Sequence, residues 1–127
     1  MALTLGVAHA QDEDVTIEVT DVGSGIYMLT GQGGNIGLSV GDDTTFMIDD
    51  QFAPLTLKIL AAVASVTDTP VKFVVNTHYH ADHTGGNENL GTAGALIVAH
   101  DNVRARMSTA GEGPITGRGR KAQPEGS

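Results

Sequence analysis

The chain has 127 residues, about the length of one ordinary domain, and 40% of them are hydrophobic, which is enough for a packed core. Its formal net charge of −8 disfavours contact with a phosphate backbone, so no nucleic-acid partner is expected. The absence of Cys excludes disulfides and thiolate metal ligands. No apolar run is long enough to span a membrane, so no membrane partner is expected either.

The first ten residues have the composition of the end of an export signal. Residues 2–10 form a short run of small and apolar residues that ends Ala8-His9-Ala10, and an acidic stretch follows. Small residues at these positions suit cleavage after Ala10, although a basic n-region is missing. We expect residues 1–10 to be a truncated signal peptide and the protein to be periplasmic or secreted. The alternative is a frayed terminus or a buried strand in a cytoplasmic protein.

The next part of the chain has the pattern of short strands separated by turns. Apolar and polar residues alternate, and Gly-rich or Asp-rich clusters interrupt the pattern, as in an antiparallel meander. The turn signals are strongest at residues 31–34 and 41–43. The predicted strands are Val15–Val19, Gly25–Leu29, Asn35–Val40 and Thr44–Ile48.

The period of the hydrophobic pattern changes after Pro54. Residues 55–66 place apolar side chains on one helical face, which predicts an amphipathic helix packed on the sheet. Val71–Val75 follows as a buried strand, and a strand, helix and strand in this order predict a parallel pair. A short helix near Asn87–Leu90, a strand at Ala95–Ala99 and a helix at Asn102–Met107 complete the pattern.

The last part of the chain has too little apolar surface for a fold of its own. Residues 111–127 contain one large apolar residue, Ile115, among Gly, Pro and charged residues. Such a segment cannot offset the entropy of ordering it, so we predict a disordered tail. Residues 11–110 are then the part that folds.

Candidate chemistry concentrates in the segment Thr77-His78-Tyr79-His80-Ala81-Asp82-His83-Thr84-Gly85-Gly86. It follows a buried strand, and α/β sheets bind their ligands at the carboxyl ends of strands. His78 and His80 are two residues apart, so in extended backbone both project to one side and can reach one ion. Asp82 and His83 can face a second position. Nitrogen and oxygen ligands of this kind suit one or two Zn²⁺ ions, with Fe or Mn as alternatives.

The same segment resembles the histidine motif of the metallo-β-lactamase superfamily. The surrounding elements are similar too, including the strand ending Phe46-Met47-Ile48-Asp49-Asp50, and the resemblance covers residues 15–107. It implies an α/β (α+β) fold, the αββα sandwich with a metal site between its two sheets. Only the first sheet and its helices are present here, so residues 11–110 are the N-terminal part of that fold.

The resemblance also implies roles for individual residues. His78 and His80 would bind a first metal ion, and Asp82 and His83 a second. Asp82 would be the catalytic residue that holds the nucleophile or accepts its proton.

Five further polar residues lie near strand ends. Asp49 matches a family Asp, which implies that it orients a ligand or the loop backbone. Asp50 and Asn76 are interpreted as turn or capping residues. Asp101 is a plausible N-cap, and His100 is interpreted as structural or solvent-facing.

The implied activity is hydrolysis of a small-molecule ester, thioester, lactone or β-lactam by a metal-bound hydroxide. The family takes further ligands from its second half, and no His follows His100 in this chain. We therefore expect a truncated or frameshifted product with weak zinc binding and little activity alone. Its uncovered sheet face would promote self-association. The alternatives are a metal-binding fragment without catalysis and an iron-dependent oxidoreductase on the same fold.

Overall fold

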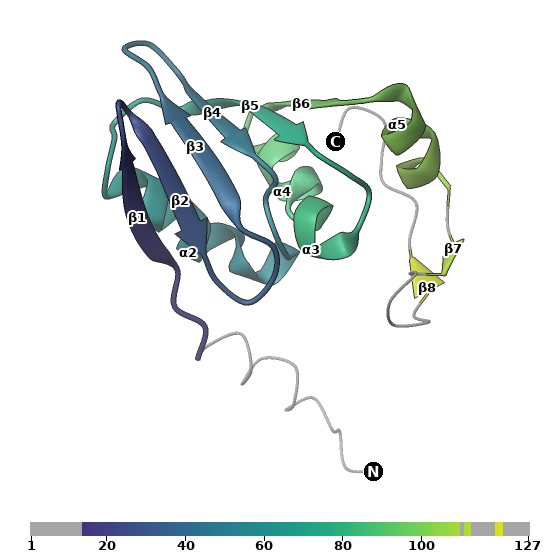
Figure 1. Ribbon diagram of the computed structural model, residues 1–127. Coiled ribbons are helices and arrows are strands. Elements are labelled where there is room, and N and C mark those ends of the chain that lie inside the picture. The colour runs from purple at the N-terminus through teal and green to yellow at the C-terminus, as the bar shows by residue number, and fades with distance from the viewer. Residues whose placement is uncertain (1–13, 110, 113–118, 121–127) are drawn as a thin grey trace.

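The computed structural model describes residues 14–109, 111–112 and 119–120. Its main feature is a six-stranded sheet in which the strands lie in the order of the sequence (Figure 1). These strands are β1 (Glu18–Gly23), β2 (Ile26–Thr30), β3 (Ile36–Val40), β4 (Thr45–Ile48), β5 (Val71–Asn76) and β6 (Leu96–Ala99). A separate short pair consists of β7 (Gly111–Glu112) and β8 (Gly119–Arg120).

The sheet is mixed. β1 to β4 form an antiparallel meander, and β5 and β6 add to it in parallel. Helical connections join β4 to β5 and β5 to β6, as parallel neighbours require. The predicted meander and the predicted parallel pair are both confirmed, and the fold is α+β.

Helices α2 (Thr56–Ala64) and α4 (Asn87–Thr92) cover one face of the sheet and lie behind it in Figure 1. The other helical segments are η1 (Ala53–Leu55), α3 (Ala81–Thr84) and α5 (Asp101–Met107), and α5 lies beside the sheet, past the end of β6. The predicted helical stripe is present, since Ile59 and Val63 of α2 are buried. The core between the helices and the sheet contains Leu29, Leu38, Met47, Leu55, Val74 and Leu90.

The other face of the sheet is apolar and partly exposed in the part of the chain that the structure describes. Side chains alternate along a strand. Phe46 and Ile48 therefore point away from the helices, as do Leu96 and Val98 on β6, and their exposed fractions are 41%, 42%, 57% and 42%. Phe46 stacks on Phe73 of β5, with 4.8 Å between the ring centroids. This second face therefore carries several exposed large apolar side chains.

Two sequence predictions were wrong in detail. The first strand begins at Glu18 rather than Val15, because its partner strand ends at Thr30, opposite Glu18, and leaves residues 15–17 without a pairing partner. Asp101 is the first residue of α5 and not its N-cap. The cap is His100, whose Nδ1 accepts a hydrogen bond from the Asn102 N–H at 3.1 Å.

Two predictions concern segments that the structure does not describe. The signal peptide at residues 1–10 lies outside the described residues, and so does most of the predicted tail at 111–127, apart from β7 and β8. Both stay predictions. No helix among the described residues has the length and apolarity needed to cross a membrane.

Candidate metal centre

The histidine loop begins where β5 ends. Asn76, the last residue of β5, is buried and exchanges two side-chain hydrogen bonds with Asn87 of α4, at 3.0 and 2.7 Å. The chain then runs through His80 into the short helix α3, and the Thr84 hydroxyl closes this turn by donating to the His80 carbonyl at 3.0 Å. These bonds hold both ends of the loop, so its side chains start from fixed backbone positions.

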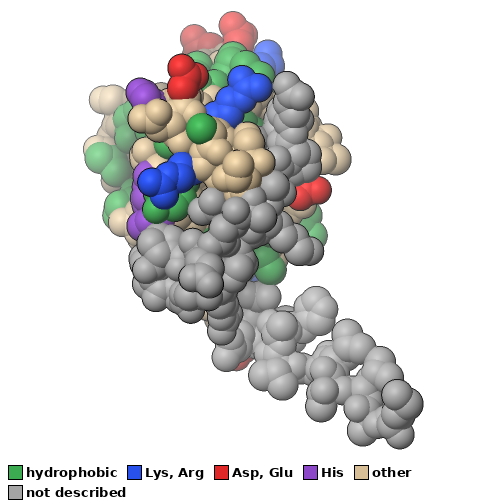
Figure 2. All heavy atoms as spheres, turned by 90° about the vertical axis from the view of Figure 1, so that its right-hand side faces the viewer, with side chains coloured by type: hydrophobic (Ala, Val, Ile, Leu, Met, Phe, Trp, Pro, Cys, Tyr) green, Lys and Arg blue, Asp and Glu red, His purple; other side chains and the backbone are tan. Residues whose placement is uncertain are grey.

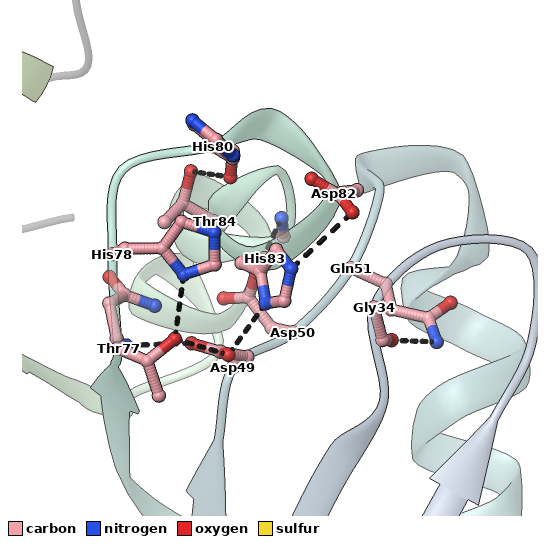
Figure 3. A network of polar contacts seen from close by, with 12 residues as sticks. Gly34, Asp49, Asp50, Gln51, Thr77, His78, His80, Asp82, His83 and Thr84 are labelled. Carbon is pink, nitrogen blue, oxygen red and sulfur yellow. Dashed lines mark hydrogen bonds and ion pairs between the residues drawn. The ribbon is translucent and has the colours of Figure 1, made fainter. Parts of the chain in front are cut away.

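The three histidine rings of the loop lie together (Figure 3). The His78 ring centroid is 4.6 Å from that of His80 and 4.0 Å from that of His83. Asp82 approaches from the other side, with its Oδ2 3.4 Å from His83 Nε2. The predicted ligands His78, His80, Asp82 and His83 are therefore brought into one cluster.

Asp49 lies beneath this cluster at the end of β4 and is buried. Its Oδ1 accepts a hydrogen bond from the Thr77 N–H at 2.8 Å. Its Oδ2 lies 2.7 Å from both the Thr77 hydroxyl and His83 Nδ1. The carboxylate thus fixes the start of the loop and the orientation of one imidazole.

The donor set fits a divalent metal ion. One ligand atom each from Asp49, His78 and His83 lie within 4.8 Å of one another, although nearby acidic groups are common without an ion. This trio differs from the predicted pairs, because it includes Asp49 and leaves His80 and Asp82 at its edge. Both Asp49 oxygens already accept hydrogen bonds, which is compatible with the predicted orienting role. The roles of Asp49 and of the four loop residues stay predictions.

Two groups at the site have shifted pKa values. Desolvation, followed by the neighbouring His83 and His80, lowers the pKa of His78 below its usual 6.5, which favours the neutral ring that binds metals. Burial raises the pKa of Asp50 from 3.8 to about 7, although the hydrogen bond from the Gly86 N–H opposes the shift. Asp50 therefore carries its charge at a high desolvation cost.

The turn between β2 and β3 forms one wall of the site. The Gly34 N–H donates to the Asp82 carbonyl at 3.3 Å. A Cβ at Gly34 would overlap the His83 ring, and one at Gly33 would lie 2.9 Å from Asp82 Cβ. Only glycine permits this close approach, which explains the paired glycines in the turn.

A basic side chain stands beside the loop on the side that carries α5. The Arg106 guanidinium carbon lies 5.0 Å from the centre of the Tyr79 ring, which in turn lies 5.0 Å from the His80 ring. Figure 2 shows histidine and basic side chains next to one another on this side of the molecule. The surface of the site is therefore not uniformly acidic, despite the charge of the chain.

A comparison with protein families decides what this site belongs to. The family model described as metallo-beta-lactamase superfamily matches residues 29–121. The chain belongs to the metallo-beta-lactamase superfamily. The match spans the histidine loop and most of the sheet, so the resemblance of the motif and of the element order is confirmed.

Known members of the superfamily are similar to this chain. A hydroxyacylglutathione hydrolase from a Polaromonas species is 35% identical over 65 residues, which are 50% of this chain and 25% of that protein. Two subclass B3 metallo-beta-lactamases share the fold. One, MEM-A1 from a soil metagenome library, has a TM-score of 0.71 at 20% identity, over 86% of this chain and 44% of that one. The other, BJP-1 of Bradyrhizobium japonicum, has a TM-score of 0.66 at 20% identity, over 78% and 39%.

The chain spans less than half the length of these superfamily members. The described residues supply one helix-backed sheet and the histidine loop at its edge. At identities of about 20% the solved structures establish the fold alone. The activity of the superfamily members is therefore only proposed for this chain.

Asp50 and Gln51 have contacts near the loop that the sequence does not indicate. The sequence interpretation of Asp50 is a turn or capping residue; its buried carboxylate accepts the N–H of Gly86, the residue before α4, at 2.9 Å, and its backbone N–H donates to the His83 carbonyl. Gln51 was not singled out, although it is fully buried and donates to the Gly34 carbonyl at 2.6 Å. The only sequence signal was a run of three polar residues directly after an apolar strand.

Proposed function

We propose that this chain is the metal-binding N-terminal portion of a zinc-dependent hydrolase that acts on small-molecule esters, thioesters, lactones or β-lactams. The observation that carries the proposal is the cluster of three imidazoles and one carboxylate at the end of β5, with His83 oriented by buried Asp49. Ligands held in this way by a second layer of hydrogen bonds are typical of metal centres.

The residues of the loop have distinct roles in this proposal. His78 and His80 would hold a first metal ion, and Asp82 and His83 would hold a second. A bound zinc ion lowers the pKa of a water molecule towards neutrality and polarises a substrate carbonyl oxygen. The Asp82 carboxylate, which is partly exposed and lies 3.4 Å from His83 Nε2, would orient that water and accept its proton.

Thioesters are the first substrates to test, because a hydroxyacylglutathione hydrolase is 35% identical to this chain over 65 residues. The name of that relative describes a glutathione thioester as its substrate. The β-lactamases share only the fold, so a β-lactam is the second class, followed by lactones and simple esters. The acidic net charge disfavours nucleic acids as substrates.

The test combines metal analysis with hydrolysis assays on the purified chain. We expect zinc in preference to iron or manganese after growth with all three metals, and slow turnover of a thioester that disappears in Asp82→Asn. Iron with redox activity would favour the oxidoreductase alternative. Zinc binding without turnover of any of the four substrate classes would reduce the chain to a metal-binding fragment.

A further inference from the structure

We propose that Gln51 is a positioning residue of the metal centre, because its side chain holds the β2–β3 turn against the histidine loop (Figure 3). The inference rests on the proposed metal binding and extends it to a residue outside the histidine motif. Gln51 touches neither the histidine rings nor Asp82 through any hydrogen bond that the structure records, so its effect on the metal passes through the turn.

Gln51 is a buried polar residue with an unusual backbone conformation. The residue is 0% exposed, and its backbone has φ +57°, in the left-handed region that disfavours residues other than glycine. Such a conformation is unfavourable for a residue with a Cβ and persists only where the surroundings hold it. Its Nε2 donates a short hydrogen bond of 2.6 Å to the Gly34 carbonyl. That bond is the specific contact that the buried amide makes.

The Gly34 peptide connects Gln51 to two of the predicted ligands, Asp82 and His83. Its carbonyl accepts from Gln51, while its N–H donates to the Asp82 carbonyl at 3.3 Å. The same glycine packs so closely on the His83 ring that no Cβ would fit. A displacement of the turn would therefore alter the positions of Asp82 and His83.

The backbone of Gln51 also contacts the far side of the histidine loop. A Cβ at Gly85, the residue that ends α3, would lie 2.6 Å from the Gln51 carbonyl oxygen. Gln51 thus lies between the β2–β3 turn and the end of α3. The segment that contains Asp82 and His83 is held from both sides through one residue.

Three substitutions separate the amide contact from simple packing. Gln51→Glu and Gln51→Leu keep the approximate size and remove the N–H donor. Gln51→Asn keeps the amide and tolerates the left-handed backbone, but it is one methylene too short to reach Gly34. We expect all three to weaken zinc binding by roughly tenfold to a hundredfold, as loss of an outer hydrogen bond at a metal site does. Competition with a chromogenic chelator measures the affinity.

A second readout distinguishes positioning from stability. The visible spectrum of the Co²⁺-loaded protein reports ligand geometry, and we expect its bands to shift in the Gln51 variants. The control is Thr45→Val at the other end of β4, where the buried Thr45 loses a 2.7 Å hydrogen bond to the Thr69 hydroxyl, away from the histidine loop. It should lower the unfolding free energy without changing the affinity or the spectrum.

The outcomes are distinct from those that test the proposed function. Gln51 variants with wild-type zinc affinity and a wild-type Co²⁺ spectrum would overturn the positioning role and leave the hydrolase proposal intact. Equal losses of affinity in the Gln51 variants and in Thr45→Val would also overturn it, because stability alone would then explain the effect. A wild-type chain that binds no metal would refute both proposals.

Discussion

Asp49 shows how one buried side chain can organise the histidine loop. It receives hydrogen bonds from the Thr77 N–H, the Thr77 hydroxyl and His83 Nδ1. Its backbone has φ +60°, and that of Gln51 has φ +57°. The chain therefore reverses direction sharply after β4, and successive side chains reach different loops. Backbone strain at this point is offset by these contacts.

Asp50 gives a prediction about pH. Because its folded pKa is near 7 and the ordinary value is 3.8, the folded chain resists ionisation that the unfolded chain undergoes freely. The contribution of Asp50 to stability is therefore full below about pH 4 and is lost as the pH rises through 7. Asp50→Asn should raise the unfolding free energy of the metal-free protein at pH 8, by up to about 4 kcal/mol, and change it little at pH 4. Urea unfolding at the two pH values measures this.

A gain from Asp50→Asn that is the same at both pH values would contradict the prediction, since titration would then not be its cause.

The positive φ angles of Asp49 and Gln51 could not have been predicted from the sequence. Asp and Gln carry no local signal for the left-handed region as strong as that of glycine. The role of Asp50 depends on a contact with Gly86, 36 residues away, and that of Gln51 on a contact with Gly34, 17 residues away.

At the scale of elements, the hydrophobic period was sufficient to predict most of the fold. Residues 55–66 have helical spacing, and α2 follows it with Ile59 and Val63 buried. Val71–Val75 is predicted as a buried strand, and β5 does lie between β4 and β6 in the parallel part of the sheet. Of these five residues only Val74 is buried and Lys72 is exposed, because one face of the strand is not covered by helices. Alternation failed at residues 15–17, where Val15 and Ile17 pack on the core without strand pairing. Alternation reports burial, whereas pairing depends on where the partner strand ends.

Helix α2 gives a prediction about stability. Ile59 is 1% exposed and packs in the core, so Ile59→Ala should lower the unfolding free energy by about 2–5 kcal/mol. Leu57 lies on the same helix and is 81% exposed, which makes Leu57→Ala the matched control, with a change within about 0.5 kcal/mol. Chemical denaturation measures both variants. Equal losses in the two would show that α2 does not pack on the sheet as described.

For the whole molecule, the important feature is a sheet with helices on one side only. Sheets and helices form stable domains as packed layers, and the outer face of β4, β5 and β6 has no layer over it among the described residues. The chain spans about 40% of the length of the metallo-beta-lactamases that share its fold. The position of the histidine loop at the edge of this face was predictable from the motif and the strand order, whereas the degree of exposure was not.

We expect this face to mediate self-association of the isolated chain. Phe46, Ile48, Leu96 and Val98 are each more than 40% exposed and lie on β4 and β6, the two strands that flank β5. Sedimentation velocity over a range of concentrations should show dimers or larger species. The double variant Phe46→Lys with Leu96→Lys should shift the protein to monomer, while Leu57→Lys on α2 should not. A wild-type chain that stays monomeric at high concentration would contradict this expectation.

The most direct measurement is the zinc stoichiometry and affinity of the purified chain compared with those of the double variant His78→Ala with His80→Ala. His100→Ala is the control, because it removes an exposed histidine that caps α5 and lies outside the cluster. We predict that the double variant loses zinc binding, whereas His100→Ala retains it. Equal zinc affinity in the wild-type chain and the double variant would contradict the metal centre on which the proposed hydrolase function depends.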